Sequence, residues 1–68
     1  MSAPALHADA REWLGWTTTA TGDQLEEVRA EKWEIVKAGN DLRSQIQAEF
    51  VIEVIDNQLT ERWETANA

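Results

Sequence analysis

The sequence predicts an all-α fold, and three observations support this class. Apolar residues recur at intervals of three and four along most of the chain after residue 23. Residues that cap helices precede these stretches, and a Gly-Asn-Asp run at residues 39–41 divides them. We therefore expect a helical hairpin over about 23–38 and 41–66, within one small helical domain that spans 1–68.

A short helix over about 4–14 is predicted near the N-terminus. Pro4 suits the first turn of a helix, and Gly15 stands where a helix often ends. The three threonines after Trp16 are stiff at χ1 and resist helix formation. Residues 15–22 are therefore interpreted as a connector, so that 1–22 forms the N-terminal helix and connector and 23–68 forms the hairpin.

The helix predicted over about 23–38 is amphipathic. Thr21 with Gln24, or Asp23 with Glu26, gives the spacing of a capping box. Its apolar face contains Leu25, Val28, Trp33, Ile35 and Val36. Its charged side chains are interpreted as a solvated face, which contains Glu27, Glu31, Lys32 and Lys37.

The stretch EFVIEVIDNQL at residues 49–59 contains four β-branched residues, which locally favours a strand. Adjacent apolar pairs break the alternation of a strand, whereas a helix places one apolar row on a single face. That row contains Ala48, Val51, Ile52, Ile55, Leu59, Trp63 and Ala66. Four β-branched residues cost a helix about 2 kcal/mol relative to alanine. Burying two of these side chains stabilises the fold by about 1.5–3 kcal/mol each, which exceeds that cost. A helix is therefore predicted over about 41–66.

The segment around Gly39 leaves two arrangements open. Gly39 is a natural helix stop, and Asn40 or Asp41 can cap a new helix, which favours the hairpin. Glycine inside a helix costs only about 1 kcal/mol. One continuous helix from about 23 to 66 is therefore the alternative.

A hairpin folded about residues 39–41 leaves the end of its second helix without a partner. Residue 25 then lies near residue 54 or 55, so Leu59 and Trp63 extend past the preceding helix. Either the N-terminal segment or a helix of another subunit must cover this apolar surface. We expect a homo-oligomer, and the predicted self-association or partner interface consists of Val51, Ile52, Ile55, Leu59, Trp63 and Trp16.

Composition restricts the classes of partner. Thirteen acidic and six basic residues give a net charge of −7, which disfavours direct binding to nucleic acid or to an anionic membrane. The chain has no cysteine, which excludes disulfides and thiolate metal sites and fits a reducing compartment. No apolar run approaches the ~20 residues that span a bilayer, and no signal peptide is recognised. We therefore expect a cytoplasmic protein with a protein partner.

Motifs for catalysis or for ligand binding are weak. His7 is the only histidine, and the only serines that could act as a nucleophile beside it are Ser2 and Ser44. The three glycines are too far apart for a phosphate-binding loop. We expect no enzyme activity, no cofactor and no metal site.

Two functions remain open from the sequence. The first is a small acidic protein-protein interaction or assembly protein that self-associates through its C-terminal helix, as a subunit or adaptor of a larger complex such as a viral one. The alternative is a stoichiometric inhibitor whose acidic face occupies a basic nucleic-acid-binding site, as a DNA mimic or an anti-defence protein. This acidic face consists of Glu49, Glu53, Asp56 and Glu64.

Overall fold

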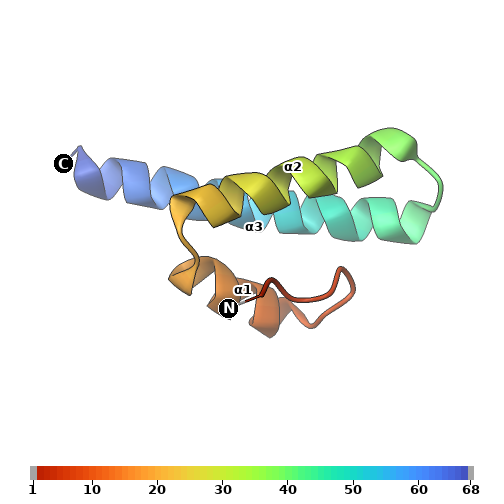
Figure 1. The fold of residues 1–68 in the computed structure, drawn as a ribbon, viewed down its shortest axis with the longest axis horizontal. Helices are drawn as coiled ribbons and strands as arrows, with labels where there is room; N and C mark the ends of the chain where they lie inside the picture. Colours follow the sequence, from red (N-terminus) through yellow and green to blue (C-terminus); the bar gives the residue numbers. More distant parts are fainter. Residues whose placement is uncertain (1, 68) are drawn as a thin grey trace.

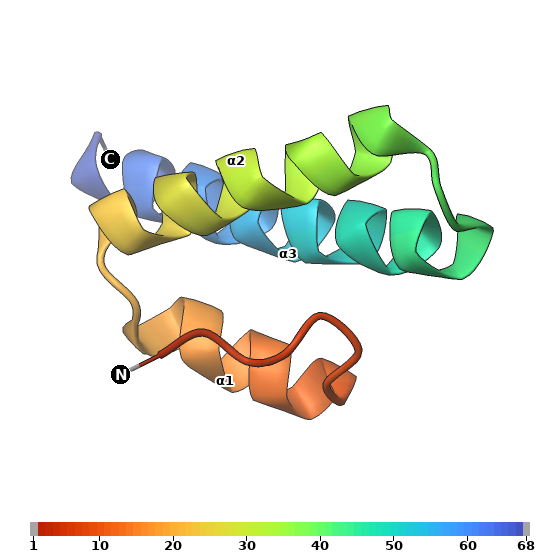
Figure 2. The same ribbon diagram turned by 45° about the vertical axis from the view of Figure 1, so that its right-hand side comes forward.

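The computed structural model describes residues 2–67, which form three helices (Figure 1). Helix α1 spans Ala10–Thr19, α2 spans Gly22–Ala38 and α3 spans Leu42–Ala66. Helices α2 and α3 pack against each other, and α1 packs against α3. Figure 2 shows α1 beneath the α2–α3 pair, with the N-terminal arm, residues 2–9, folding back along it. The prediction of an all-α fold is confirmed.

The chain reverses direction at residues 39–41, between α2 and α3. Gly39 adopts a left-handed conformation with φ of 58°, and its N–H donates to the carbonyl of Ile35. Asp41 caps α3 by accepting hydrogen bonds from two N–H groups of the first turn. The Gly-Asn-Asp run thus ends one helix and starts the next, so the structure has two helices here and not one continuous helix.

The structure corrects the predicted boundaries of the N-terminal helix, which were about 4–14 with a connector over 15–22. Helix α1 begins after Asp9, whose carboxylate accepts a hydrogen bond of 3.1 Å from the backbone N–H of Arg11. It continues through Gly15 and the threonines, so that only two residues separate it from α2.

The threonine run is helical because its side chains form hydrogen bonds within α1 and one of them packs in the core. The hydroxyls of Thr17 and Thr18 donate to the carbonyl of Leu14, at 3.0 and 2.8 Å. Thr17 also lies on the buried face of α1, beside Trp13 and Trp16. Packing of this face outweighs the low helix propensity of threonine.

The hydrophobic core joins all three helices. Its buried residues are Trp13, Trp16, Ala20, Leu25, Val28, Val51 and Ile55. The rings of Trp13 and Trp16 meet edge to face, with centroids 5.8 Å apart and planes at 87°. Such a pair contributes about 0.5–1.5 kcal/mol beyond the area that it buries.

Lys32 is buried, which corrects its interpretation as part of a solvated face. It is 9% exposed, and its Nζ lies 5.6 Å from the ring centroid of Trp13. Lys32 follows Val28 by four residues, so it shares the face of α2 that meets the core. Its aliphatic stem covers apolar surface while its ammonium group contacts the aromatic ring. Trp33, by contrast, is 38% exposed.

The side chain of Arg62 in α3 forms hydrogen bonds with the C-terminal end of α1. Its Nη2 donates to the carbonyls of Thr17 and Ala20, at 3.0 and 2.7 Å. The last carbonyls of a helix lack partners within the helix and carry partial negative charge. A guanidinium group supplied by α3 therefore completes the C-terminus of α1.

We expect the substitution Arg62→Ala to lower the free energy of unfolding by about 1–2 kcal/mol, because hydrogen bonds from a charged group to helix carbonyls are lost. Urea unfolding followed by circular dichroism measures this change. Arg11→Ala, which removes the same charge from the exposed side of α1, should change the free energy by less than about 0.5 kcal/mol. Equal effects of the two substitutions would contradict the proposed role of Arg62.

Candidate functional site

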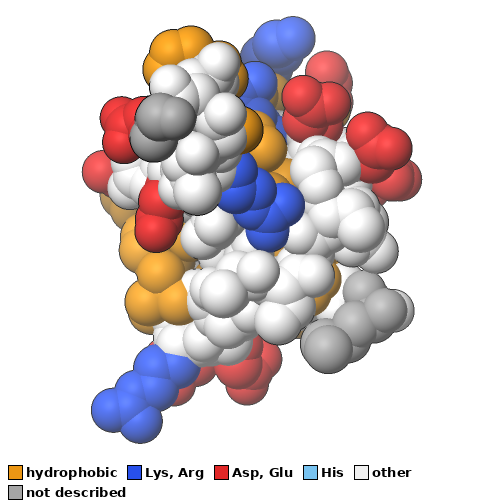
Figure 3. All heavy atoms as spheres, turned by 90° about the vertical axis from the view of Figure 1, so that its left-hand side faces the viewer, with side chains coloured by type: hydrophobic (Ala, Val, Ile, Leu, Met, Phe, Trp, Pro, Cys, Tyr) orange, Lys and Arg blue, Asp and Glu red, His pale blue; other side chains and the backbone are white. Residues whose placement is uncertain are grey.

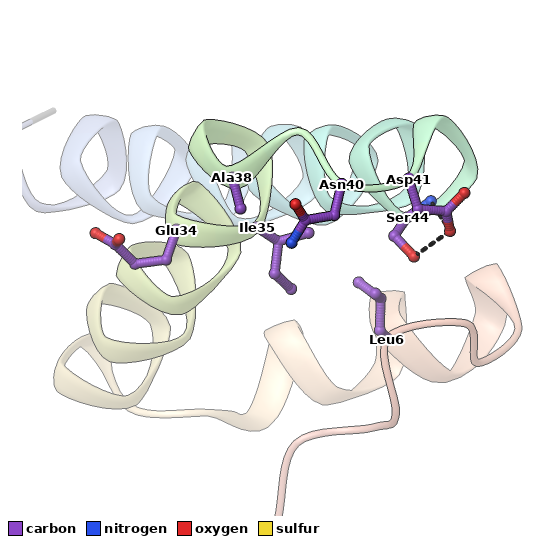
Figure 4. A pocket seen from close by; sticks show the side chains of 7 residues that line it. All are labelled: Leu6, Glu34, Ile35, Ala38, Asn40, Asp41 and Ser44. Carbon is purple, nitrogen blue, oxygen red and sulfur yellow. Dashed lines mark hydrogen bonds between the residues drawn. The ribbon is translucent and has the colours of Figure 1, made fainter.

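A cavity of about 380 Å³ lies beside the turn between α2 and α3, and we call it the turn pocket. Leu6 of the N-terminal arm points into it from one side and Ile35 of α2 from the other (Figure 4). The rest of its lining consists of Glu34, Ala38, Asn40, Asp41 and Ser44. Glu34 lies 3.7 Å from the ammonium group of Lys37, in an exposed ion pair within α2.

The structure brings His7 close to Ser44 and Asp41 at the edge of the turn pocket. The Ser44 Oγ lies 3.4 Å from His7 Nε2. It also donates a hydrogen bond of 2.8 Å to Asp41 Oδ2, which Figure 4 draws as a dashed line. These are the residue types of a hydrolase triad, but their order differs. In a triad the histidine takes the serine proton and the carboxylate orients the histidine. Here the serine proton is directed at the carboxylate.

The electrostatics of Asp41 fit a helix cap better than a general base. The hydrogen bond from the Ser44 hydroxyl, followed by the one from the Ser44 backbone N–H, lowers the pKa of Asp41 below its ordinary value. A carboxylate with a lowered pKa is a weaker base. We therefore interpret Asp41 and Ser44 as the cap of α3. His7 contacts this cap and holds the N-terminal arm against it. The residues lie 37 positions apart, so no local sequence pattern could have predicted this contact.

The C-terminal end of α3 carries the most exposed aromatic side chain among the described residues. We call residues 59–67 the α3 tip, and Figure 1 shows that the end of α3 extends past α1 and α2. Trp63 is 66% exposed, whereas Leu59 is partly buried against the core. Figure 3 views this end of the molecule and shows apolar side chains at the surface, with acidic side chains at several places around them.

The structure separates the residues of the predicted interface into two groups. Val51, Ile52 and Ile55 are at most 5% exposed, and Trp16 is 6% exposed, because the chain itself covers them. Trp63 remains available to a partner, together with the exposed part of Leu59. Self-association through the predicted interface stays a prediction. In the folded monomer, only the interface residues in the α3 tip are exposed enough to contact a second copy.

The predicted acidic face is present but not uniform. Glu49, Glu53 and Glu64 are exposed on α3. Asp56 is engaged with α2, since its Oδ1 accepts a hydrogen bond of 2.6 Å from Arg29 Nε in an ion pair. The guanidinium group of Arg29 also lies 6.0 Å from the ring centroid of Trp33. Three of the four carboxylates are therefore available to a basic partner.

A second apolar surface lies at the opposite end of α3. A groove of about 560 Å³ is lined by His7, Leu42, Arg43, Ile46 and Gln47, and we call it the amino-end groove. Leu42 is 71% exposed and Ile46 is 58% exposed. The sequence contained a signal for this surface, because Leu42 and Ile46 lie about 100° and about 140° around the helix from Leu59.

Among residues 2–67, no group of three histidine, aspartate or glutamate side chains is placed to hold a metal ion. None of the helices in the same range combines the length and the apolar character that crossing a bilayer requires.

The lowered pKa of Asp41 predicts a pH dependence. A carboxylate with a lowered folded-state pKa stabilises the fold above its ordinary pKa, and this contribution is lost as the pH falls through the folded-state value. Asn also caps helices, so Asp41→Asn mainly removes the charge. We expect the stability difference between the wild type and this variant to be largest near neutral pH and to decline as the pH falls below about 4. It should vanish only below the lowered folded-state pKa of Asp41.

Urea unfolding at a series of pH values measures this difference. Glu49→Gln, which removes one negative charge from an exposed position of α3, is the matched control for the change in net charge. A difference between wild type and Asp41→Asn that does not change with pH would contradict the prediction.

Comparisons of the chain with models of protein families, with curated proteins and with solved structures give no match.

Proposed function

We propose that this protein is a small acidic interaction or assembly protein that self-associates through the C-terminal part of α3. The observation that carries the proposal is the exposure of Trp63, 66% of whose surface faces water at the end of a helix that extends past its neighbours. Tryptophan is enriched among residues that dominate the energy of protein interfaces. The proposed role is that of a subunit or adaptor of a larger complex, and the proposed location is the cytoplasm.

The energy available from Trp63 is large for a chain of this size. Burying a large aromatic side chain covers about 150–250 Å², which is worth roughly 4–6 kcal/mol at about 25 cal/mol per Å². About two thirds of that remains to be gained by Trp63, because the rest of its surface is already covered. Association costs several kcal/mol in lost freedom, so an interface centred on one tryptophan is weak and reversible.

Trp63 is also the residue that tests the proposal without harming the fold. Ile55 is fully buried, so Ile55→Asp would place a charge in the core and dissociate an oligomer by unfolding its subunits. Trp63→Gln removes an exposed ring and leaves the core unchanged. Leu14→Gln is the matched control, because Leu14 is an exposed apolar residue of α1 with 52% exposure.

We expect the wild-type protein to shift from monomer to oligomer as its concentration is raised toward about 1 mM, because the contact is weak. Trp63→Gln should remain a monomer with unchanged helicity over the same range. Leu14→Gln and Glu53→Lys should retain the wild-type mass. Sedimentation velocity with circular dichroism on the same samples measures both properties. A wild-type protein that is monomeric and fully helical would refute self-association.

The alternative, an inhibitor of a basic nucleic-acid-binding site, is supported by the exposure of Glu49, Glu53 and Glu64. It differs in its salt dependence, because binding between an acidic face and a basic partner weakens steeply as salt screens the charges. The pairing of Asp56 with Arg29 reduces the charge that this face presents. We therefore rank this function second.

A further inference from the structure

The two exposed apolar surfaces of α3 lie at opposite ends of the molecule. Leu42 and Trp63 are 21 positions apart, which at 1.5 Å per helical residue places them about 31 Å from each other. The longest dimension of the molecule is 41 Å. The α3 tip of one copy therefore cannot reach the amino-end groove of the same copy, but it can reach that of another.

The amino-end groove suits an apolar residue with acidic neighbours. Leu42 and Ile46 offer exposed apolar surface, and the volume of about 560 Å³ falls in the range of clefts that hold small organic groups. Arg43 borders the groove, is exposed and forms no ion pair within residues 2–67. In a chain of net charge −7, this end offers a cation to a partner.

The α3 tip has the complementary chemistry. Trp63 supplies a large apolar ring, and Glu61 and Glu64 are exposed within one helical turn of it. Apolar surface and opposite charge thus match between the two ends of the same helix. Resting on the self-association proposed above, we propose that the α3 tip of one copy docks into the amino-end groove of the next copy, so that copies join end to end.

The acidic middle of α3 disfavours the side-by-side alternative. If Trp63 lay over residue 43 in an antiparallel pair of α3 helices, Glu53 would face Glu53 of the second copy, since it lies midway between these positions. Glu49 and Glu53 are both exposed, and like charges that face each other destabilise a contact. End-to-end docking uses both apolar ends and keeps these carboxylates apart.

End-to-end docking makes a specific prediction about mixtures. Trp63→Gln lacks a working tip but keeps its groove, whereas Ile46→Asp lacks a working groove but keeps its tip. Each variant alone should sediment as a monomer, and an equimolar mixture should form a dimer that grows no further. Wild-type protein should exceed the mass of a dimer as its concentration rises, because every copy has both ends.

Leu42→Asp provides a second groove variant, because this position is 71% exposed at the start of α3, where an acidic residue is well tolerated. Leu14→Gln should behave as wild type. If Ile46→Asp and Leu42→Asp keep the wild-type mass, or if the mixture stays monomeric, the tip does not dock into the groove. A wild-type particle that stops at the dimer would overturn end-to-end assembly, and a monomeric wild type would instead refute the underlying self-association.

Discussion

The burial of Trp13 and Trp16 against α2 and α3 is the contact on which the rest of the structure depends. A chain of this length buries only about 60% of the surface that its unfolded form exposes, so its core is small. Two large aromatic side chains from α1 remove about 300–500 Å² from water. They also cover one side of the cluster formed by Leu25, Val51 and Ile55. Helix α1 is therefore an integral layer of the fold.

Two cations strengthen the attachment of α1. Lys32 of α2 contacts the ring of Trp13, and Arg62 of α3 binds carbonyls at the end of α1. Arg62 also has a consequence for the surface. Successive helical residues point about 100° apart, so anchoring Arg62 against α1 directs its neighbour Trp63 away from it. The same contact that completes α1 thus fixes the direction in which the α3 tip presents its tryptophan.

The helices of the α2–α3 pair could be predicted from sequence because their signals are local. Gly39 ends α2 and Asp41 caps α3, and both effects depend only on neighbouring residues. The spacing of the apolar residues identifies α3. The boundaries of α1 could not be predicted, because the packing of Thr17 beside the tryptophans favours helix there and leaves no local signal in the sequence. Burial of Lys32 depends on a ring from another helix, and the contact of His7 with Ser44 joins distant residues. The apolar row was identified, but its division into core and exposed tip depends on where α1 lies.

The distribution of exposed apolar residues along α3 bears on how the proposed self-association would be restricted to a few orientations. A net charge of −7 keeps two copies apart in most orientations, so attraction must come from short contacts. The outer middle of α3 carries Glu49 and Glu53, whereas its two ends carry apolar side chains. An interface at one end buries little area, and interfaces below about 1,200 Å² are typically transient. An assembly of the kind proposed would therefore be weak and reversible.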